Sequence, residues 1–299
     1  MIHGYGCGEE QLVHYTAHRI DGPIRIDGDL DKEPWRSAAR SSRFVDLVTG
    51  APALLDTRMA ALWDDAALYV GFWIEEPRVQ ARLAERDAFV WTENDVEVFI
   101  GGDDCYYEFQ INALGTVYEV FYIWQEAYRH GERFRRRPEF DLAVRSVDVL
   151  GGFQDASRCG RHPRGRRWAF MDWDLSGLSA AVRVDGTLND DSDIDRGWTA
   201  EIAFPWAGMA ALFAGRAWPP CEGDVLRLDF SRFEHVDAGG RRLSPSLGWA
   251  LNPHGVYDSH IPECFSYVHL GGRRPPAHRL TCKRRVHPSQ PIRPTEETP

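Results

Sequence analysis

The chain has 299 residues, of which 43% are hydrophobic, 12% are aromatic and 27% are charged, and its net charge is −10. This composition is typical of a globular protein and excludes a wholly disordered chain, while the length allows one large domain with a sizeable core. The negative net charge argues against a nucleic-acid-binding protein, which needs a basic surface.

Neither a signal peptide nor a membrane-spanning segment is visible. Residues 1–11 contain no Lys or Arg and no apolar stretch. The longest nearly apolar run, residues 202–214, is too short for a bilayer and is interrupted by Pro205. We therefore expect a cytoplasmic protein, or an extracellular one if the sequence is a truncated piece, and we expect neither membrane nor nucleic acid as a partner.

The cysteines stand singly, and no two of them have the short spacing of a zinc site. Scattered reduced thiols are therefore expected in preference to a scaffold of disulfides. The six residues are Cys7, Cys105, Cys159, Cys221, Cys264 and Cys282.

Short strand patterns separated by turn residues dominate the chain from residue 23 to residue 124. Residues 59–63 and 68–74 are predicted to form two strands joined by a short turn. Every other residue of the second strand is apolar, so one of its faces is expected to point into a core. The residues on that face are Leu68, Val70, Phe72 and Ile74.

An Arg-rich stretch interrupts this pattern over about residues 126–177 and predicts a long irregular insertion, whose positive charge either contacts an anion or is solvated. Strand patterns resume at residues 178–184, 198–204 and 225–233. Pro205 is expected to open one short helix over residues 206–213, because proline suits a first helical turn.

Many short strands with a single short helix predict an all-β fold, namely an antiparallel β-sandwich. We expect the sandwich to span residues 23–270, after an N-terminal extension at residues 1–22. Residues 271–299 are rich in Pro and Arg and poor in apolar residues, so they are predicted to form a flexible tail.

The segment from residue 91 to residue 112 carries the most informative pattern. Gly-Gly-Asp-Asp at residues 101–104 predicts the turn of a hairpin between two alternating runs. With these four residues as the loop, Glu97 lies opposite Glu108, and one face of the hairpin is polar. The polar face consists of Asp95, Glu97, Glu108, Gln110 and Asn112.

Like charges directly opposite each other destabilise a hairpin. The pairing of Glu97 with Glu108, and of Asp95 with Gln110, therefore predicts a bound cation, a neighbouring Arg or a ligand that donates hydrogen bonds. A solvated polar face with the carboxylates splayed apart is the alternative.

Six stretches follow one another in an order that is informative as a set: residues 26–35, 57–72, 94–100, 107–112, 197–205 and 260–265. Together they resemble the family 9 carbohydrate-binding modules and their stand-alone relatives. The resemblance extends from about residue 23 to residue 270, apart from the Arg-rich insertion. It implies a β-sandwich of the immunoglobulin or DOMON-like jelly-roll type.

In the sugar-binding members of this family, two tryptophans enclose a terminal sugar, and charged and amide side chains bind its hydroxyl groups. By position, the resemblance implies that Trp91 is one wall and that Glu97, Gln110 and Asn112 are hydroxyl partners. Gln110 stands where such members have a basic residue, so the identity of the sugar is open.

The second aromatic wall is harder to assign. Trp249 is the candidate, with Asn252 as a polar neighbour, and a core position for Trp249 is the alternative reading. In that case Tyr257 would take its place.

Three carboxylates alternate along residues 191–195 with the oxygen-rich spacing of calcium loops. The EF-hand pattern fails, because Arg196 stands where a glycine should make the turn. Structural calcium at this loop is the one cofactor that the sequence suggests, and an acidic loop without metal is the alternative. The residues are Asp191, Asp193 and Asp195.

The function that these patterns favour is non-catalytic binding of a saccharide or a chain end, by aromatic stacking and polar residues of the sheet face. A carbohydrate-active enzyme is the partner protein that this function suggests. One alternative is a glycoside hydrolase, since Glu97 and Glu108 on neighbouring strands could approach the separation of about 5 Å that retaining enzymes use. Another is an interaction module that has lost its sugar site.

Overall fold

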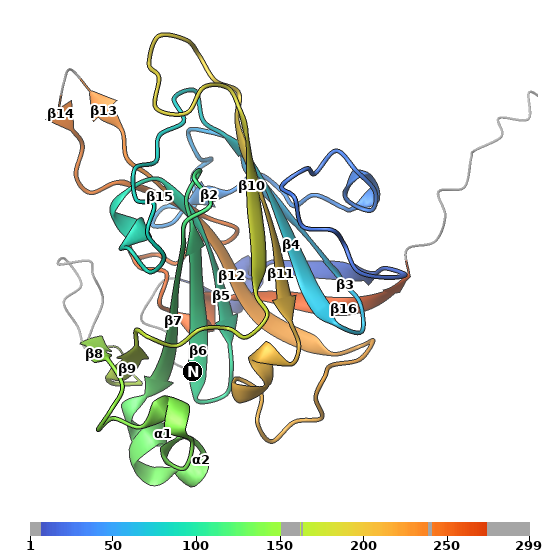
Figure 1. Ribbon diagram of the computed structural model, residues 1–299, viewed down its shortest axis with the longest axis vertical. Helices are drawn as coiled ribbons and strands as arrows, with labels where there is room; N and C mark the ends of the chain where they lie inside the picture. The colour runs from blue at the N-terminus through green and yellow to red at the C-terminus, as the bar shows by residue number, and fades with distance from the viewer. Residues whose placement is uncertain (1–6, 151–161, 163, 239–240, 274–299) are drawn as a thin grey trace, which may run out of the picture.

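A computed structural model describes residues 7–150, 162, 164–238 and 241–273 of the chain. Strands dominate these residues, and the helices are short (Figure 1). The strands are β1 His14–Arg19, β2 Val45–Asp46, β3 Thr57–Trp63, β4 Ala67–Glu75, β5 Asp95–Gly101, β6 Cys105–Ile111, β7 Val117–Trp124, β8 Val147–Leu150, β9 Arg167–Phe170, β10 Ser179–Asp185, β11 Gly197–Pro205, β12 Val225–Glu234, β13 Asp237–Ala238, β14 Arg241–Arg242, β15 Leu247–Ala250 and β16 Ser266–Arg273. The helices are α1 Gln125–His130 and α2 Glu132–Arg135, with the 3-10 turns η1 Glu9–Gln11, η2 Trp35–Ser37, η3 Val90–Thr92, η4 Pro138–Phe140, η6 Gly208–Ala211 and η7 Pro262–Cys264.

One continuous sheet of 14 strands runs in the order β10-β11-β4-β3-β1-β16-β12-β5-β6-β7-β9-β8, with β15 beside β12 and β2 beside β15. This sheet folds back on itself, so that β4 and β11 share a hydrophobic core with β5, β6 and β12 (Figure 1). Aromatic rings meet across the core: the ring centroids of Phe109 and Phe204 are 5.3 Å apart, and those of Phe72 and Phe230 are 6.2 Å apart. The predicted all-β sandwich is confirmed.

The first strand departs from the predicted organisation. β1 lies between β3 and β16 and pairs with both in parallel, whereas the other strand pairs of the described chain are antiparallel. Its residues come from the stretch before residue 23 that the sequence assigned to an extension. β16 likewise continues past the predicted boundary at residue 270, and residues 274–299 of the predicted tail lie outside the described residues.

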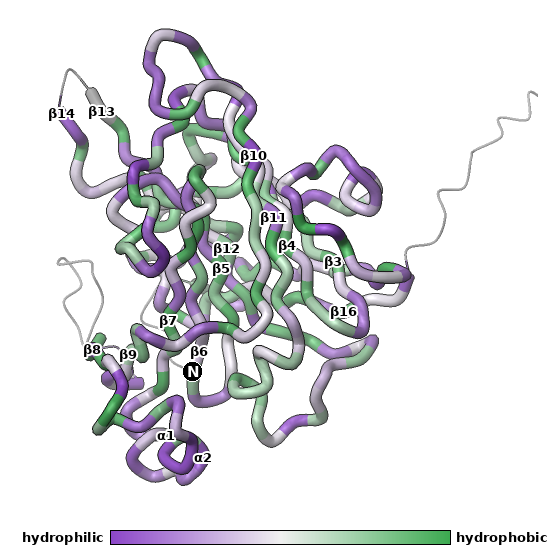
Figure 2. Tube along the Cα trace, viewed as in Figure 1, coloured by the Kyte–Doolittle hydropathy of each residue, from purple (hydrophilic) through white to green (hydrophobic). Residues whose placement is uncertain are grey.

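Apolar residues concentrate along the central strands, whereas α1 and α2 are mostly hydrophilic (Figure 2). The core-facing side of β4 is the one that its alternation predicts. The short helix expected over residues 206–213 is the 3-10 turn η6, and the Arg-rich insertion contains α1, α2, β8 and β9 where an irregular loop was expected. None of the helices in the described part of the chain is long and apolar enough to cross a membrane.

The hairpin of β5 and β6 has a different register from the one predicted. Glu97 lies opposite Gln110, because strand pairing continues to Gly101, which the prediction placed in the turn. The expected pairs of Glu97 with Glu108 and of Asp95 with Gln110 are therefore wrong. Since the displacement is two residues, every side chain keeps its predicted face of the sheet.

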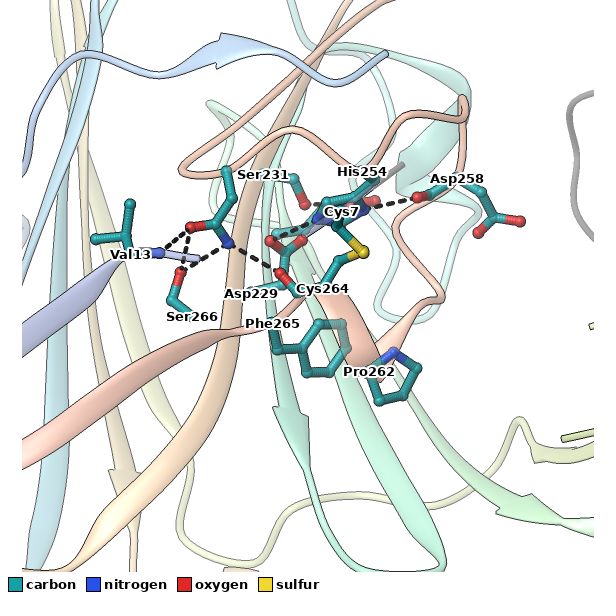
Figure 3. Close-up of polar contacts among 12 residues, drawn as sticks. Cys7, Val13, Asp229, Ser231, His254, Asp258, Pro262, Cys264, Phe265 and Ser266 are labelled. Carbon is teal, nitrogen blue, oxygen red and sulfur yellow. Dashed lines mark hydrogen bonds and ion pairs between the residues drawn. A yellow bond between two sulfur atoms is a disulfide. The ribbon is translucent and has the colours of Figure 1, made fainter. Parts of the chain in front are cut away.

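A disulfide between Cys7 and Cys264 corrects the expectation of scattered reduced thiols (Figure 3). Its Cα atoms are 5.9 Å apart, within the usual range for such a bond. It ties the segment before β1 to the turn η7 before β16. Cys105 and Cys221 are free thiols, and Cys159 and Cys282 lie outside the described residues.

Glu201 on β11 fixes the loop that precedes η2. Its side chain is 0% exposed, and its two oxygens accept hydrogen bonds from the indole of Trp35 at 2.7 Å and from the backbone N–H groups of Asp27 and Gly28 at 2.8 and 2.9 Å. The ammonium group of Lys32 lies 3.1 Å away and supplies the opposite charge. A buried carboxylate is stable only with such partners, so the stretch at residues 26–35 is recognisable because it surrounds this one anion.

We expect Glu201→Ala to lower the free energy of unfolding by about 3–5 kcal/mol, because it leaves buried donors and a cation without their acceptor. Chemical denaturation monitored by tryptophan fluorescence measures this change. The matched control is Asp185→Asn, which removes an exposed carboxylate paired with Arg196 and should cost less than about 1 kcal/mol. Equal effects of the two substitutions would contradict the role of Glu201.

Candidate functional site

Strands β5, β6 and β7 are buried on both faces. Their inner faces belong to the core, and their outer faces carry polar and aromatic side chains. The alternation of β6 shows this division: Tyr107 and Phe109 point inward, whereas Glu108 and Gln110 lie on the outer face. The outer face is therefore covered by other parts of the chain and encloses space.

A cavity of about 690 Å³ lies over this outer face. The sheet provides one side of the cavity through Glu97, Glu108 and Gln110, while its rim comes from η3, from β8 and β9 of the Arg-rich insertion, and from residues 244–246 and 257–260. The lining residues are Phe89, Trp91, Thr92, Glu97, Glu108, Gln110, Tyr118, Tyr122, Asp148, Val149, Leu150, Ala169, Met171, Phe233, His235, Ser244, Pro245, Ser246, Tyr257, Asp258, Ser259 and His260.

A hydrogen-bond network joins the carboxylates of the cavity. The side-chain amide of Gln110 donates to Glu97 Oε1 at 2.9 Å and to Glu108 Oε1 at 2.7 Å. Ser231 donates to the second oxygen of Glu97 at 2.8 Å, and Tyr122 donates to the second oxygen of Glu108 at 2.7 Å. All four carboxylate oxygens thus have a donor, and neither carboxylate can rotate without losing one.

Burial changes the acidity of both carboxyl groups. It raises the pKa of Glu108 from 4.5 to about 7, against the hydrogen bonds from Tyr122 and Gln110 that favour the anion. Burial also raises the pKa of Glu97 well above its usual value, and the neighbouring carboxylates of Asp95 and Glu108 raise it further. Adding negative charge here is unfavourable, because the groups are removed from water and repel one another.

Aromatic rings flank the carboxylates in two groups. Trp91 is 50% exposed, and its ring centroid lies 5.8 Å from that of Phe89. Tyr257 packs edge-on against Phe233 with a centroid distance of 5.5 Å. The cavity therefore combines exposed ring surface with a fixed polar floor, which consists of Glu97, Glu108 and Gln110.

Four of the residues predicted from the sequence, namely Trp91, Glu97, Glu108 and Gln110, come together in this cavity, as does the alternative wall Tyr257. Trp249 does not line it: the side chain is 2% exposed in the hydrophobic core, 5.1 Å from the guanidinium of Arg232. The reading of Trp249 as a core residue therefore agrees with the geometry.

The remaining predicted polar residues hold the backbone in place. Asn252 is fully buried, accepts a hydrogen bond from the backbone of Val13 at 2.7 Å and donates to the carbonyl of Cys264 at 2.9 Å. Asn112 donates to the carbonyl of Leu83 at 2.8 Å. Neither lines the cavity, and the same is true of Asp95, which is fully buried and accepts from the backbone of a neighbouring strand.

The three aspartates predicted to bind calcium have separate partners. Asp195 accepts hydrogen bonds from the backbone N–H groups of Val79 and Thr187 at 2.8 and 2.6 Å, so it fixes the loop itself. Asp191 and Asp193 accept from other side chains, at 3.1 and 3.0 Å. Across the described residues, no group of three or more His, Cys, Asp or Glu side chains is arranged to hold a metal ion.

Sequence reasoning missed most of the rim. Tyr118 and Tyr122 could have been found, because they alternate along β7 on the same face as each other. His260 and the residues contributed by β8 and β9 gave no comparable signal, since only the folded chain brings them to β6 and β7. Their presence assigns the Arg-rich insertion a place at the cavity rim.

Because the pKa of Glu108 is raised in the folded state, the free energy of unfolding should depend on pH through this group. The folded state binds more protons than the unfolded state between pH 4.5 and about 7, so this carboxyl stabilises the fold less as the pH rises through that window. We therefore expect Glu108→Gln to gain stability relative to the wild type between about pH 5 and about pH 8, by up to about 3 kcal/mol. Denaturation curves of both proteins at several pH values measure this difference.

Glu132→Gln is the matched control, because Glu132 is exposed on α2. This variant should follow the wild type at every pH. The assignment fails if the wild type and Glu108→Gln have the same dependence of stability on pH.

The comparisons with known proteins agree with this architecture. The family model of carbohydrate-binding family 9 matches residues 52–181, and a search of curated proteins gives no match. A protein from Bacteroides uniformis ATCC 8492 that is assumed to bind carbohydrate is 13% identical, with a TM-score of 0.54 over 87% of this chain and 99% of that one. At that identity the likeness supports the fold.

A family 9 carbohydrate-binding module from Caldicellulosiruptor kristjanssonii, solved with cellotriose, is 14% identical, with a TM-score of 0.46 over 94% of this chain and 100% of that one. A family 9 carbohydrate-binding module from the same organism, solved with glucose, is 13% identical, with a TM-score of 0.46 over 87% of this chain and 97% of that one. The match of the family model over residues 52–181 confirms the resemblance found in the sequence: this chain is a protein like those of carbohydrate-binding family 9.

Proposed function

We propose that the protein binds a saccharide without catalysis and holds one sugar ring or a chain end in the cavity over β5, β6 and β7. The observation that carries this proposal is the arrangement of Trp91, which is half exposed, with the Gln110 amide that fixes Glu97 and Glu108. Sugar rings have apolar C–H faces that pack on aromatic rings, and hydroxyl groups that need oriented partners. The cavity offers both kinds of contact.

The balance between these contacts determines the strength of binding. Each hydrogen bond to a sugar hydroxyl replaces one to water and contributes only about 0.5–1.5 kcal/mol. The polar floor therefore selects the orientation of the ring, while contact with Trp91 and Tyr257 supplies much of the affinity. We expect dissociation constants between about 1 µM and 1 mM, or about −8 to −4 kcal/mol.

The geometry does not favour a glycoside hydrolase. Glu97 and Glu108 share one amide donor, and the pKa of each is raised by burial. A retaining hydrolase needs the two carboxyl groups to differ, one as an acid and the other as an ionised nucleophile. Here burial raises the pKa of both Glu97 and Glu108, so the surroundings do not separate an acid from an ionised nucleophile.

Two further parts of the proposal concern a partner protein and the cellular compartment in which the protein works. Binding without catalysis can hold a carbohydrate-active enzyme near its substrate, and such an enzyme is the partner we propose. The Cys7–Cys264 disulfide supports an oxidising compartment, since disulfides persist outside the reducing cytosol. Titration of the unfolded, non-reduced protein should then find at most four of the six thiols, and six free thiols would contradict this part of the proposal.

The decisive variant is Trp91→Ala. Because Trp91 is half exposed, the fold should tolerate the change, while loss of the ring face should weaken binding of the best saccharide at least tenfold, or by about 1.4 kcal/mol. Isothermal titration calorimetry after a glycan-array screen measures the effect.

Trp73→Ala is the matched control, since this half-buried indole lies on β4 and outside the cavity. It should bind like the wild type once circular dichroism shows both variants folded. Unchanged binding by Trp91→Ala would overturn the stacking arrangement, and the interaction-module alternative would replace it.

A further inference from the structure

The acidic side chains that line the cavity have no Lys or Arg side chain among them. Four carboxylate residues line it, namely Glu97, Glu108, Asp148 and Asp258, and neither Lys nor Arg is among its lining residues. This is unusual in a chain with 35 basic residues. A second groove, of about 580 Å³ near η2 and β10, is lined by both signs, and its Asp185 pairs with Arg196 at 2.7 Å.

Among the described residues, Glu97 makes no ion pair, and Glu108 has only the ring of His260 at 3.9 Å. Burial, together with the nearby Arg167, lowers the pKa of His260 well below its usual value, so that ring is neutral at physiological pH. The polar partners of the two glutamates are an amide and two hydroxyl groups. No cation therefore lies against them among the described residues, and burial raises the pKa of both. A positively charged ligand placed beside them would favour their ionised form.

The cavity also presents a buried acceptor without a donor. Gln110 is 1% exposed, and its amide N–H groups donate to Glu97 and Glu108. Its Oε1 has no hydrogen-bond partner within the described part of the chain. A buried acceptor without a partner is costly. A ligand that donates hydrogen bonds and carries positive charge would satisfy this acceptor and the adjacent carboxylates together.

We propose that the saccharide is an amino sugar whose protonated amine lies against Glu97, Glu108 and Gln110. This inference rests on the function proposed above and narrows its ligand class. An ammonium group offers three donors and no acceptor, which matches a floor made of acceptors. The rings of Tyr118 and Tyr122 beside the two carboxylates would add cation–π attraction.

Three disaccharides with the same β-1,4-linked backbone separate the contributions of the sugar and the charge. They are the glucosamine dimer, its N-acetylated form and cellobiose, which carry an amine, a neutral amide and a hydroxyl group at C2. Calorimetry at about pH 7.2 keeps most of the amine protonated, since amines of this kind lose their proton near pH 8. This pH also lies at or above the pKa of about 7 of Glu108, so this carboxyl is available in its ionised form. We expect the glucosamine dimer to bind at least tenfold more tightly than either neutral disaccharide.

Glu108→Gln should reduce this preference to less than about threefold, because it removes one charge while keeping the size of the side chain. Asp185→Asn is the matched control, since it removes a carboxylate from the other groove, and it should keep the full preference.

The outcomes distinguish the two proposals. Equal or tighter binding of a neutral disaccharide overturns the amino-sugar inference and leaves saccharide binding intact. A preference that survives in Glu108→Gln also overturns the inference, because the charge would not be its cause. Absence of binding by all three disaccharides and by the glycan array overturns the proposed function and the inference with it.

Discussion

Burial of β5, β6 and β7 on both faces is the constraint on which the rest of the structure depends. The inner faces satisfy it with apolar residues that close the sandwich, but the outer faces carry carboxylates and an amide at positions that water cannot fully reach. Buried polar groups are tolerated only when they are hydrogen-bonded. Gln110 meets this requirement for two carboxylates at once, and so the sheet acquires a rigid polar surface beside the second hydrophobic cluster of the same face.

The cover over this surface comes from distant parts of the chain. η3 lies just before β5, β8 and β9 belong to the Arg-rich insertion after β7, and residues 257–260 precede β16. Arg167 on β9 donates to the carbonyl of His260 at 2.9 Å, which links the insertion to the last of these segments. Since loops vary more readily than sheets, this division lets the floor keep a fixed chemistry while the rim determines which ligands fit.

Local alternation predicted the strands and the polar face well, because side-chain direction in a strand has a period of two. The register error of the β5–β6 hairpin left that face unchanged, since it displaced the pairing by an even number of residues. Features that depend on contacts remote in sequence were not predictable. The parallel pairing of β1 with β16, the bond between Cys7 and Cys264, and the core position of Trp249 have no local signature.

Gln110 shows how one neutral side chain can set the preference of a site. An amide has two donor hydrogens and one acceptor oxygen, and here both hydrogens are committed to carboxylates. A Lys or Arg at this position would neutralise the floor and still have donors for the hydroxyl groups of a ligand. With Gln110 this position supplies no positive charge and leaves the side-chain oxygen without a donor in the described chain. A ligand that brings a positively charged donor can fill that acceptor and favour the ionised form of Glu97 and Glu108 together.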